Sequence, residues 1–128
     1  MDKTRGFWRG KCIYNGEWVK GDLVCDKYFD GSIGYFIFER DFDNSKSYTI
    51  DPSTLGECTG LRDKNGKLIF EGDIVEIKGN IGRVIFVDDE AGFVVDTDKK
   101  YFTMSFSSEC EIVGNIHDNP ELISERTN

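Results

Sequence analysis

The chain has 128 residues, enough to bury a core, and carries 16 basic and 24 acidic side chains, a net charge of −8. That acidity opposes non-specific attraction to nucleic acid, which depends on lysine and arginine. Neither a membrane-spanning apolar stretch of about 18 residues nor the apolar core of a signal peptide is recognisable. We therefore expect a cytoplasmic protein with no membrane partner, its four cysteines being free thiols.

Charge is unevenly distributed along the chain. Residues 1–20 carry five basic and two acidic side chains, so the rest of the chain is strongly acidic. An acidic body with a basic N-terminal segment is suited to pairing with its own copies, whereas solubility alone explains the same distribution. Both interpretations stay open.

The first half of the chain predicts short strands between turns, with almost no helical periodicity. Asn15-Gly16 predicts a hairpin tip, because this pair accepts the positive φ angles of a type I′ turn. Asp51-Pro52 is expected to end a strand, because proline donates no hydrogen bond to a sheet. The expected strands cover residues 22–25, 33–39 and 48–50.

The second half predicts a more regular series of strands. Asn65-Gly66 predicts a turn in which Asp63 bonds its own backbone. Asn119 has the features of an N-cap for a short C-terminal helical turn. The expected strands cover residues 67–70, 73–78, 83–87, 93–96, 101–106 and 111–113.

Two segments of the chain share a pattern. Asn15-Gly16 is followed by Gly21-Asp22, and Asn65-Gly66 is followed by Gly72-Asp73. Each predicts a turn, a strand and a bulge at Gly-Asp that bends the chain. Two pseudo-repeated β units explain the pattern, and so does coincidence between two ordinary hairpins.

These patterns together predict an all-β fold of small curved sheets, forming a single unit over residues 1–128 with sub-lobes at about 1–56 and 57–118. Aromatic side chains crowd the first third of the chain, more than a small lobe encloses. They favour an interface between copies over one larger shared core. These aromatic residues are Trp8, Trp18, Tyr28, Phe29, Phe36, Phe38 and Phe42.

Several blocks of sequence are specific enough to indicate a lineage. They are GEWVKGDLV at 16–24, TGLRDKNG at 59–66, EGDIV at 71–75 and IVGNIHDNPEL at 112–122. On these residues the chain resembles the YopX family of phage and prophage proteins. The resemblance implies an all-β fold, a mobile-element origin, a bacterial host cytoplasm and a ring-like homo-oligomer. It implies no established activity and no catalytic residue.

A second resemblance concerns the chain after Glu71. Gly72–Ile77, then Gly79 and Gly82–Val87, is similar to the SH3-like barrels of ribosomal and transcription-associated KOW modules. We therefore predict an SH3-like barrel in the second half. Basic residues beside this loop contact RNA in those modules, and Lys78 and Arg83 flank it here among acidic neighbours. Nucleic-acid binding is accordingly an alternative and not the main expectation.

Candidate chemistry is weak throughout the chain. His117 is the one histidine, so it would have to serve any Cys–His or Ser–His site. Residues 63–66 lack the spacing of a calcium loop, and the acidic hairpin at 88–98 is typical of solvated charge. We predict no catalytic, cofactor or metal site, and hence no enzyme.

The sequence therefore favours a non-enzymatic protein that self-assembles and binds a host or phage macromolecule through an acidic, multivalent surface. One alternative is a nucleic-acid-associated SH3-like module whose basic arm consists of Arg5, Arg9 and Lys11. The other is an acidic decoy that occupies a DNA-binding host protein by imitating phosphate charge.

Overall fold

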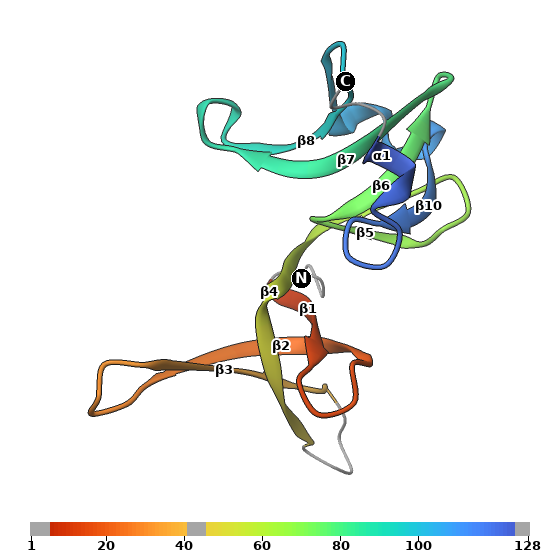
Figure 1. Cartoon of the computed structure of the whole chain (residues 1–128). Coiled ribbons are helices and arrows are strands. Elements are labelled where there is room, and N and C mark those ends of the chain that lie inside the picture. The colour runs from red at the N-terminus through yellow and green to blue at the C-terminus, as the bar shows by residue number, and fades with distance from the viewer. Residues whose placement is uncertain (1–5, 41–45, 125–128) are drawn as a thin grey trace. The chain divides into compact units, whose positions relative to one another are not determined.

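A computed structural model describes residues 6–40 and 46–124. The chain divides into two compact units, the N-terminal unit Met1–Cys58 and the C-terminal unit Thr59–Asn128. In the described residues the strands form two antiparallel sheets, and helical structure is limited to short turns (Figure 1). The predicted all-β class is therefore confirmed.

Four strand segments of the N-terminal unit close into a ring. β1 pairs with both β2 and β4, while β3 pairs with β2 on one side and β4 on the other. Alternate residues point into the ring, where Cys12, Val19, Ile37 and Ile50 form a small buried core. The strands are β1 (Phe7–Cys12), β2 (Trp18–Lys27), β3 (Ile33–Phe38) and β4 (Ser47–Arg62).

The expected strand end at Asp51-Pro52 is wrong, because β4 runs through it. Lys11 pairs with Asp51 and Arg9 pairs with Gly56, so four residues of β4 bulge out opposite Gly10. Proline is tolerated in such a bulge, where no ladder hydrogen bond is needed from its nitrogen. The Thr54 hydroxyl replaces the missing ladder partner by accepting a hydrogen bond from the Lys11 backbone N–H at 2.8 Å.

The loop between β1 and β2 also differs from the expected type I′ turn. Gly16 has a positive φ of 72°, but Asn15 is not among the described residues with positive φ, as that turn would require. Instead the Gly16 N–H reaches back to the Cys12 carbonyl at 2.8 Å, and the Asn15 side chain accepts a bond from the Glu17 N–H at 2.9 Å. The loop is therefore longer than the two-residue loop of a type I′ hairpin.

The C-terminal unit has the predicted SH3-like connectivity. Its sheet has the strand order β10-β6-β7-β8-β9, so the last strand returns to pair with the first. The 3-10 turn η2 (Met104–Glu109) precedes that last strand. The strands are β6 (Asp73–Ile77), β7 (Asn80–Val87), β8 (Gly92–Asp96), β9 (Tyr101–Thr103) and β10 (Glu111–Asn115).

The core of this unit is larger than that of the N-terminal unit. β6 contributes three consecutive fully buried side chains, Ile74 among them, because it is covered on both faces. The cluster of buried residues consists of Ile69, Val75, Ile77, Val84, Val95, Phe102, Met104 and Cys110.

The strand predicted over 101–106 stops early, at Thr103. From Met104 the chain turns into η2, and the Thr103 and Ser105 hydroxyls lie 2.6 Å apart at the junction. This turn lets both Phe102 and Met104 stay buried, and it sets the Phe106 ring edge-on to Phe102 at 6.3 Å. A 3-10 turn η1 (Asp88–Glu90) and the predicted C-terminal helical turn α1 (Glu121–Ser124) complete the described elements.

Gly72 forms a corner between the two sheets. The short strand β5 (Leu68–Phe70) pairs with β4 in the first sheet, whereas β6 begins the second sheet only two residues later. Gly72 has φ of 94°, and the buried Asp73 carboxylate accepts a bond from the Phe70 N–H at 2.8 Å across the corner. The sharp bend therefore depends on the conformational freedom of glycine and on the Asp73 side chain.

We predict that Gly72→Val lowers the free energy of unfolding by about 1–3 kcal/mol, because a β-branched residue is strained at positive φ. Chemical denaturation measures the change. Gly92→Ala is the matched control, since Gly92 has no positive φ and a Cβ there lies 3.8 Å from the Glu90 carbonyl oxygen. Equal stability of Gly72→Val and the parent chain would contradict the corner argument.

Candidate functional site

The two Gly-Asp pairs that the sequence singled out have different roles. Gly21 and Asp22 lie inside β2, in unbroken register with β1 and β3, so the bulge expected there is wrong. Gly21 is needed for space: a Cβ would overlap the Phe38 carbonyl oxygen and lie 2.8 Å from its carbon. Asp22 accepts two hydrogen bonds from the Arg40 guanidinium, at 2.8 and 3.0 Å.

Asn65 and Gly66 lie in a loop organised by Asp63. Gly66 has φ of 82°, and its N–H bonds the Asp63 carbonyl at 3.0 Å. The Asp63 carboxylate accepts bonds from three backbone N–H groups, those of Asn65, Lys67 and Ile112. Burial by itself raises the pKa of this carboxyl, but the three donors outweigh it and hold the pKa below its ordinary value.

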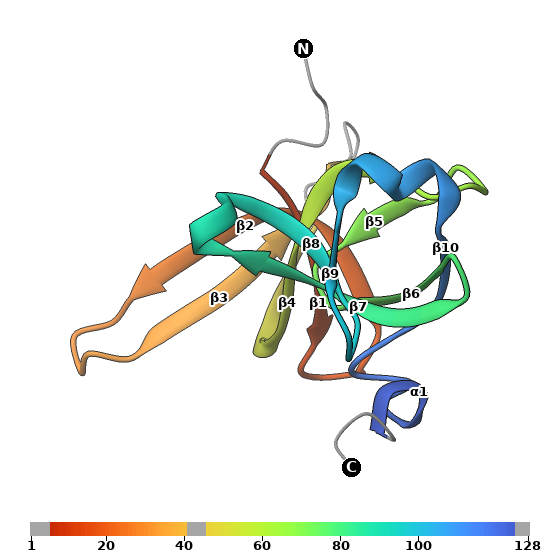
Figure 2. The same ribbon diagram turned by 90° about the horizontal axis from the view of Figure 1, so that it is seen from above.

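The outer half of the β2–β3 hairpin, residues 24–35, forms an arm on the N-terminal unit. β1 pairs with β2 only as far as Asp22, and β4 pairs with β3 only from Phe36 onward. Within the described residues, the arm strands therefore pair only with each other. Both views show the arm extending past β1 and β4 (Figure 1, Figure 2).

Apolar side chains on the arm are exposed. Phe29 at its tip is 113 % exposed, and Tyr28 and Ile33 are each 49 % exposed. Tyr28 packs across Gly34, where a Cβ would lie only 2.7 Å from the tyrosine oxygen. Tyr28 and Phe29 lie at the tip of the ribbon and Ile33 begins β3, so the ribbon exposes apolar side chains at its outer end. Of the predicted interface aromatics, Tyr28, Phe29 and Phe38 are exposed, whereas Phe42 lies outside the described residues.

The predicted basic arm is only partly described. Arg5 lies outside the described residues. The Arg9 guanidinium lies 4.8 Å and the Lys11 ammonium 5.4 Å from the centre of the Trp18 ring, and Arg9 is 9 % exposed. Both cations therefore pack against an aromatic ring of the N-terminal unit, and Arg9 offers little surface to a phosphate.

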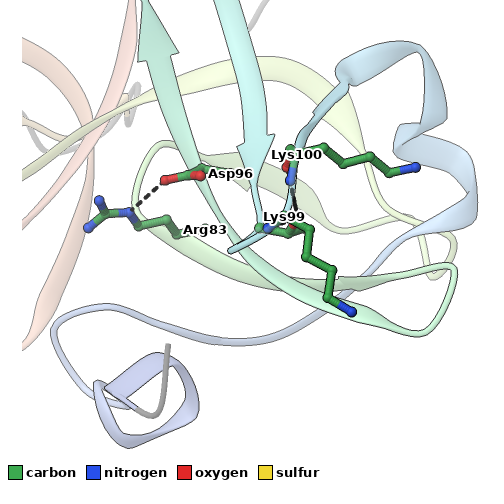
Figure 3. A network of polar contacts seen from close by, with 5 residues as sticks. Arg83, Asp96, Lys99 and Lys100 are labelled. Atoms are coloured by element: carbon green, nitrogen blue, oxygen red, sulfur yellow. Dashed lines mark hydrogen bonds and ion pairs between the residues drawn. The ribbon is translucent and has the colours of Figure 1, made fainter. Parts of the chain in front are cut away.

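The other two predicted contacts, Lys78 and Arg83, both lie in the C-terminal unit. Arg83 on β7 faces Asp96 on β8, with 3.6 Å between the guanidinium Nε and the carboxylate (Figure 3). Lys78 lies in the two-residue turn between β6 and β7, and its ammonium lies 4.1 Å from the centre of the Phe106 ring. Lys78 also lines a pocket.

That pocket has a volume of about 400 Å³ and combines lysines with aromatic rings. It is lined by Lys78 and Asn80, by residues 100–103 and by Phe106. Lys100, which follows an acidic run, was not predicted as a contact, although the Lys-Lys-Tyr-Phe series at 99–102 was the available signal.

The remaining reactive groups include the four cysteines. Cys12, Cys58 and Cys110 are buried thiols, whereas Cys25 on the arm is exposed. Burial, with a smaller contribution from nearby Asp63 and Asp73, raises the pKa of Cys110 to about 11, so its thiol stays protonated and unreactive. In the described part of the chain, no three metal-ligating side chains gather at one place.

Comparison with known proteins supports a family assignment. The family model described as YopX protein matches residues 8–124. The crystal structure of protein EF1440 from Enterococcus faecalis is similar, with 21 % identity, a TM-score of 0.55, and coverage of 91 % of this chain and 96 % of that one. At that identity the similarity concerns the fold alone, and no curated protein matches. In the described residues, no helix has the length and apolarity needed to cross a membrane. Because the family model spans nearly the whole chain, the protein belongs to the YopX family.

Proposed function

We propose that the protein is a non-enzymatic binding protein that works as a homo-oligomer, its copies joined through the arm. The observation that carries this proposal is the exposure of apolar side chains on a two-stranded ribbon at 24–35. An isolated hairpin of this kind is at best marginally stable in water. Contact with another chain would stabilise it by removing its apolar surface from solvent.

The open edges of the arm favour another copy as its partner. The outer edges of Val24–Lys27 and Ile33–Tyr35 present backbone N–H and C=O groups with no strand beside them in the described residues. Such edges pair readily with another strand. An identical arm has the same length and the same apolar pattern, so two arms match each other without a further component.

Assembly would give the chain its binding capacity. The chain carries a net charge of −8, so an oligomer displays several copies of an acidic surface. Repeated weak contacts to one macromolecule bind far more strongly than a single contact. The partner supported by this charge is a host or phage macromolecule with a basic surface.

Sedimentation velocity tests the assembly. We expect the parent chain to sediment as an oligomer, and the double variant V24K/I33K as a monomer. Val24 and Ile33 lie on opposite faces of the arm, and lysines there oppose both apolar packing and edge pairing. A loss of at least about tenfold in association affinity is expected for two charges placed in an apolar interface.

Phe86→Lys is the matched control. Phe86 on β7 is 46 % exposed, which is comparable with the exposure of Val24 and Ile33. It belongs to the C-terminal unit and is not part of the arm. The Phe86→Lys variant should have the same sedimentation coefficient as the parent oligomer. The proposal would be contradicted by a parent chain that sediments as a monomer, or by an equal loss of association in Phe86→Lys and V24K/I33K.

A further inference from the structure

We propose that the pocket between the β6–β7 turn and the β8–β9 turn of the C-terminal unit binds single-stranded nucleic acid. Its lysines would contact the phosphates, and its exposed tyrosine would stack on a base. This site goes beyond the proposed assembly, because its residues are separate from the arm.

Two tight turns bring Lys78 and Lys100 to the pocket. Lys78 and Gly79 form the two-residue turn that joins Ile77 to its cross-strand partner Asn80. Lys99 and Lys100 lie in the β8–β9 turn, where both of their backbone N–H groups bond to the Thr97 hydroxyl oxygen, at 3.3 and 3.1 Å. Figure 3 shows the Lys99 and Lys100 side chains extending away from this turn.

Lys78 has a strained backbone, which points to a role beyond folding. It has φ of 50°, a left-handed conformation, next to Gly79 at 81°. Asparagine or glycine is the usual residue at the first position of such a turn. A lysine there is less stable than either, and strain of this kind is concentrated at functional sites. Here the strain places an ammonium group against Phe106, at the mouth of the pocket.

Aromatic rings make the pocket suitable for a base. Tyr101 is 55 % exposed and lines the pocket beside Phe106. The Lys100 ammonium lies 4.7 Å from the centre of the buried Phe102 ring, so one face of that ring already stabilises a cation. A flat exposed ring flanked by lysines is the arrangement with which proteins bind single strands, by stacking together with phosphate contacts.

The acidity of the chain does not oppose binding at this place. Asp96 on β8 is engaged by Arg83 at 3.6 Å, and neither Asp96 nor Asp98 of the β8–β9 turn lines the pocket. No aspartate or glutamate is among the described residues that line it, whereas Lys78 and Lys100 are. An unpaired strand fits better than a duplex, because the bases of a duplex are stacked inside and do not reach Tyr101.

Fluorescence anisotropy of the full chain tests the site, with labelled DNA and RNA strands of about 12 nucleotides and mixed sequence as probes. We expect the logarithm of the binding constant to fall with the logarithm of salt concentration with a slope of about −1.4, for two lysine–phosphate contacts on a single strand. Tyr101→Ala should weaken binding roughly tenfold by removing one stacking ring. The same sequence as a duplex should bind more weakly.

Lys78→Asn separates binding from folding. Asparagine suits the left-handed turn, so this variant should raise the melting temperature while it weakens strand binding and flattens the salt slope by about 0.7. A variant that merely damaged the fold would lower both the melting temperature and the affinity for the strand. Lys46→Gln removes one exposed charge from the N-terminal unit and should leave the binding constant nearly unchanged.

Three results would overturn the proposed site. The first is binding without salt dependence, and the second is an equal loss of strand affinity in Lys46→Gln and Lys78→Asn. The third is displacement of the strand by polyglutamate as effectively as by unlabelled oligonucleotide, which would indicate an acidic peptide as the ligand. The monomeric variant V24K/I33K should bind a strand with the same affinity per chain. This keeps failure of the arm distinguishable from failure of the pocket.

Discussion

Replacing Asp63 by alanine is expected to lower the free energy of unfolding by about 3–4 kcal/mol. The carboxylate accepts bonds from the backbone N–H groups of Asn65, Lys67 and Ile112, at 2.9, 2.9 and 3.0 Å. It therefore closes its own loop and joins that loop to β10. Alanine would leave all three donors without this acceptor at a position where the aspartate residue is only 4 % exposed. Urea denaturation at neutral pH measures the loss.

Asp63→Asn is the control and gives a pH test. It keeps one acceptor oxygen, so it should lose less stability than the alanine variant. The folded-state pKa of Asp63 lies below its unfolded value of about 3.9, so its contribution is present at neutral pH and is lost as pH falls below that value. The stability difference between parent and Asp63→Asn should therefore shrink below about pH 4. A neutral-pH loss under about 1 kcal/mol for Asp63→Ala would contradict this account.

Gly21→Ala is the second substitution with a large expected effect, a loss of about 3 kcal/mol. The new methyl group would overlap the Phe38 carbonyl oxygen and lie 3.1 Å from the Glu39 Cα. Both neighbours are backbone, so β2 and the end of β3 would have to separate. Thermal denaturation followed by circular dichroism measures the effect.

The control for Gly21→Ala is Gly92→Ala, which has ordinary space for a Cβ. Its melting temperature should change little. Similar stabilities of Gly21→Ala and Gly92→Ala would show that the strands yield easily at Gly21, against the packing described here.

Local patterns predicted the fold class well, because the conformation of a turn depends on residues that are adjacent in the sequence. The loop at Asn65-Gly66 and the corner at Gly72 both depend on glycines with positive φ and on an aspartate within three residues. The SH3-like strand order of the C-terminal unit was implied by the resemblance of residues 72–87 to KOW modules.

Errors arose where tertiary contacts decide the role of a residue. Gly21 precedes an aspartate as Gly72 does, so the sequence predicts the same role for both. In the structure Gly21 is needed because a side chain there would collide with the carbonyl of Phe38 on another strand. Pro52 reads as a strand end, yet a bulge opposite Gly10 accommodates it and the Thr54 hydroxyl supplies the acceptor. Such information comes from strand pairing and is absent from any short window of sequence.

The candidate sites were predictable to different degrees. The surplus of aromatic residues near Phe29 was visible in composition, but the open edges of the arm depend on how far β1 and β4 extend. The lysine pocket was not visible, because Lys78 and Lys100 are distant in sequence and only the two turns bring them together.

The exposed thiol of Cys25 provides the most direct test of the assembly through the arm. Cys25 lies on the arm and is exposed, whereas the other three cysteines are buried, so alkylation of the native chain reports on the arm alone. We predict that the alkylation rate of Cys25 falls as protein concentration rises through the assembly range, and that it stays high in V24K/I33K at every concentration. An alkylation rate that is the same for the assembled parent chain and the monomeric variant would contradict the account.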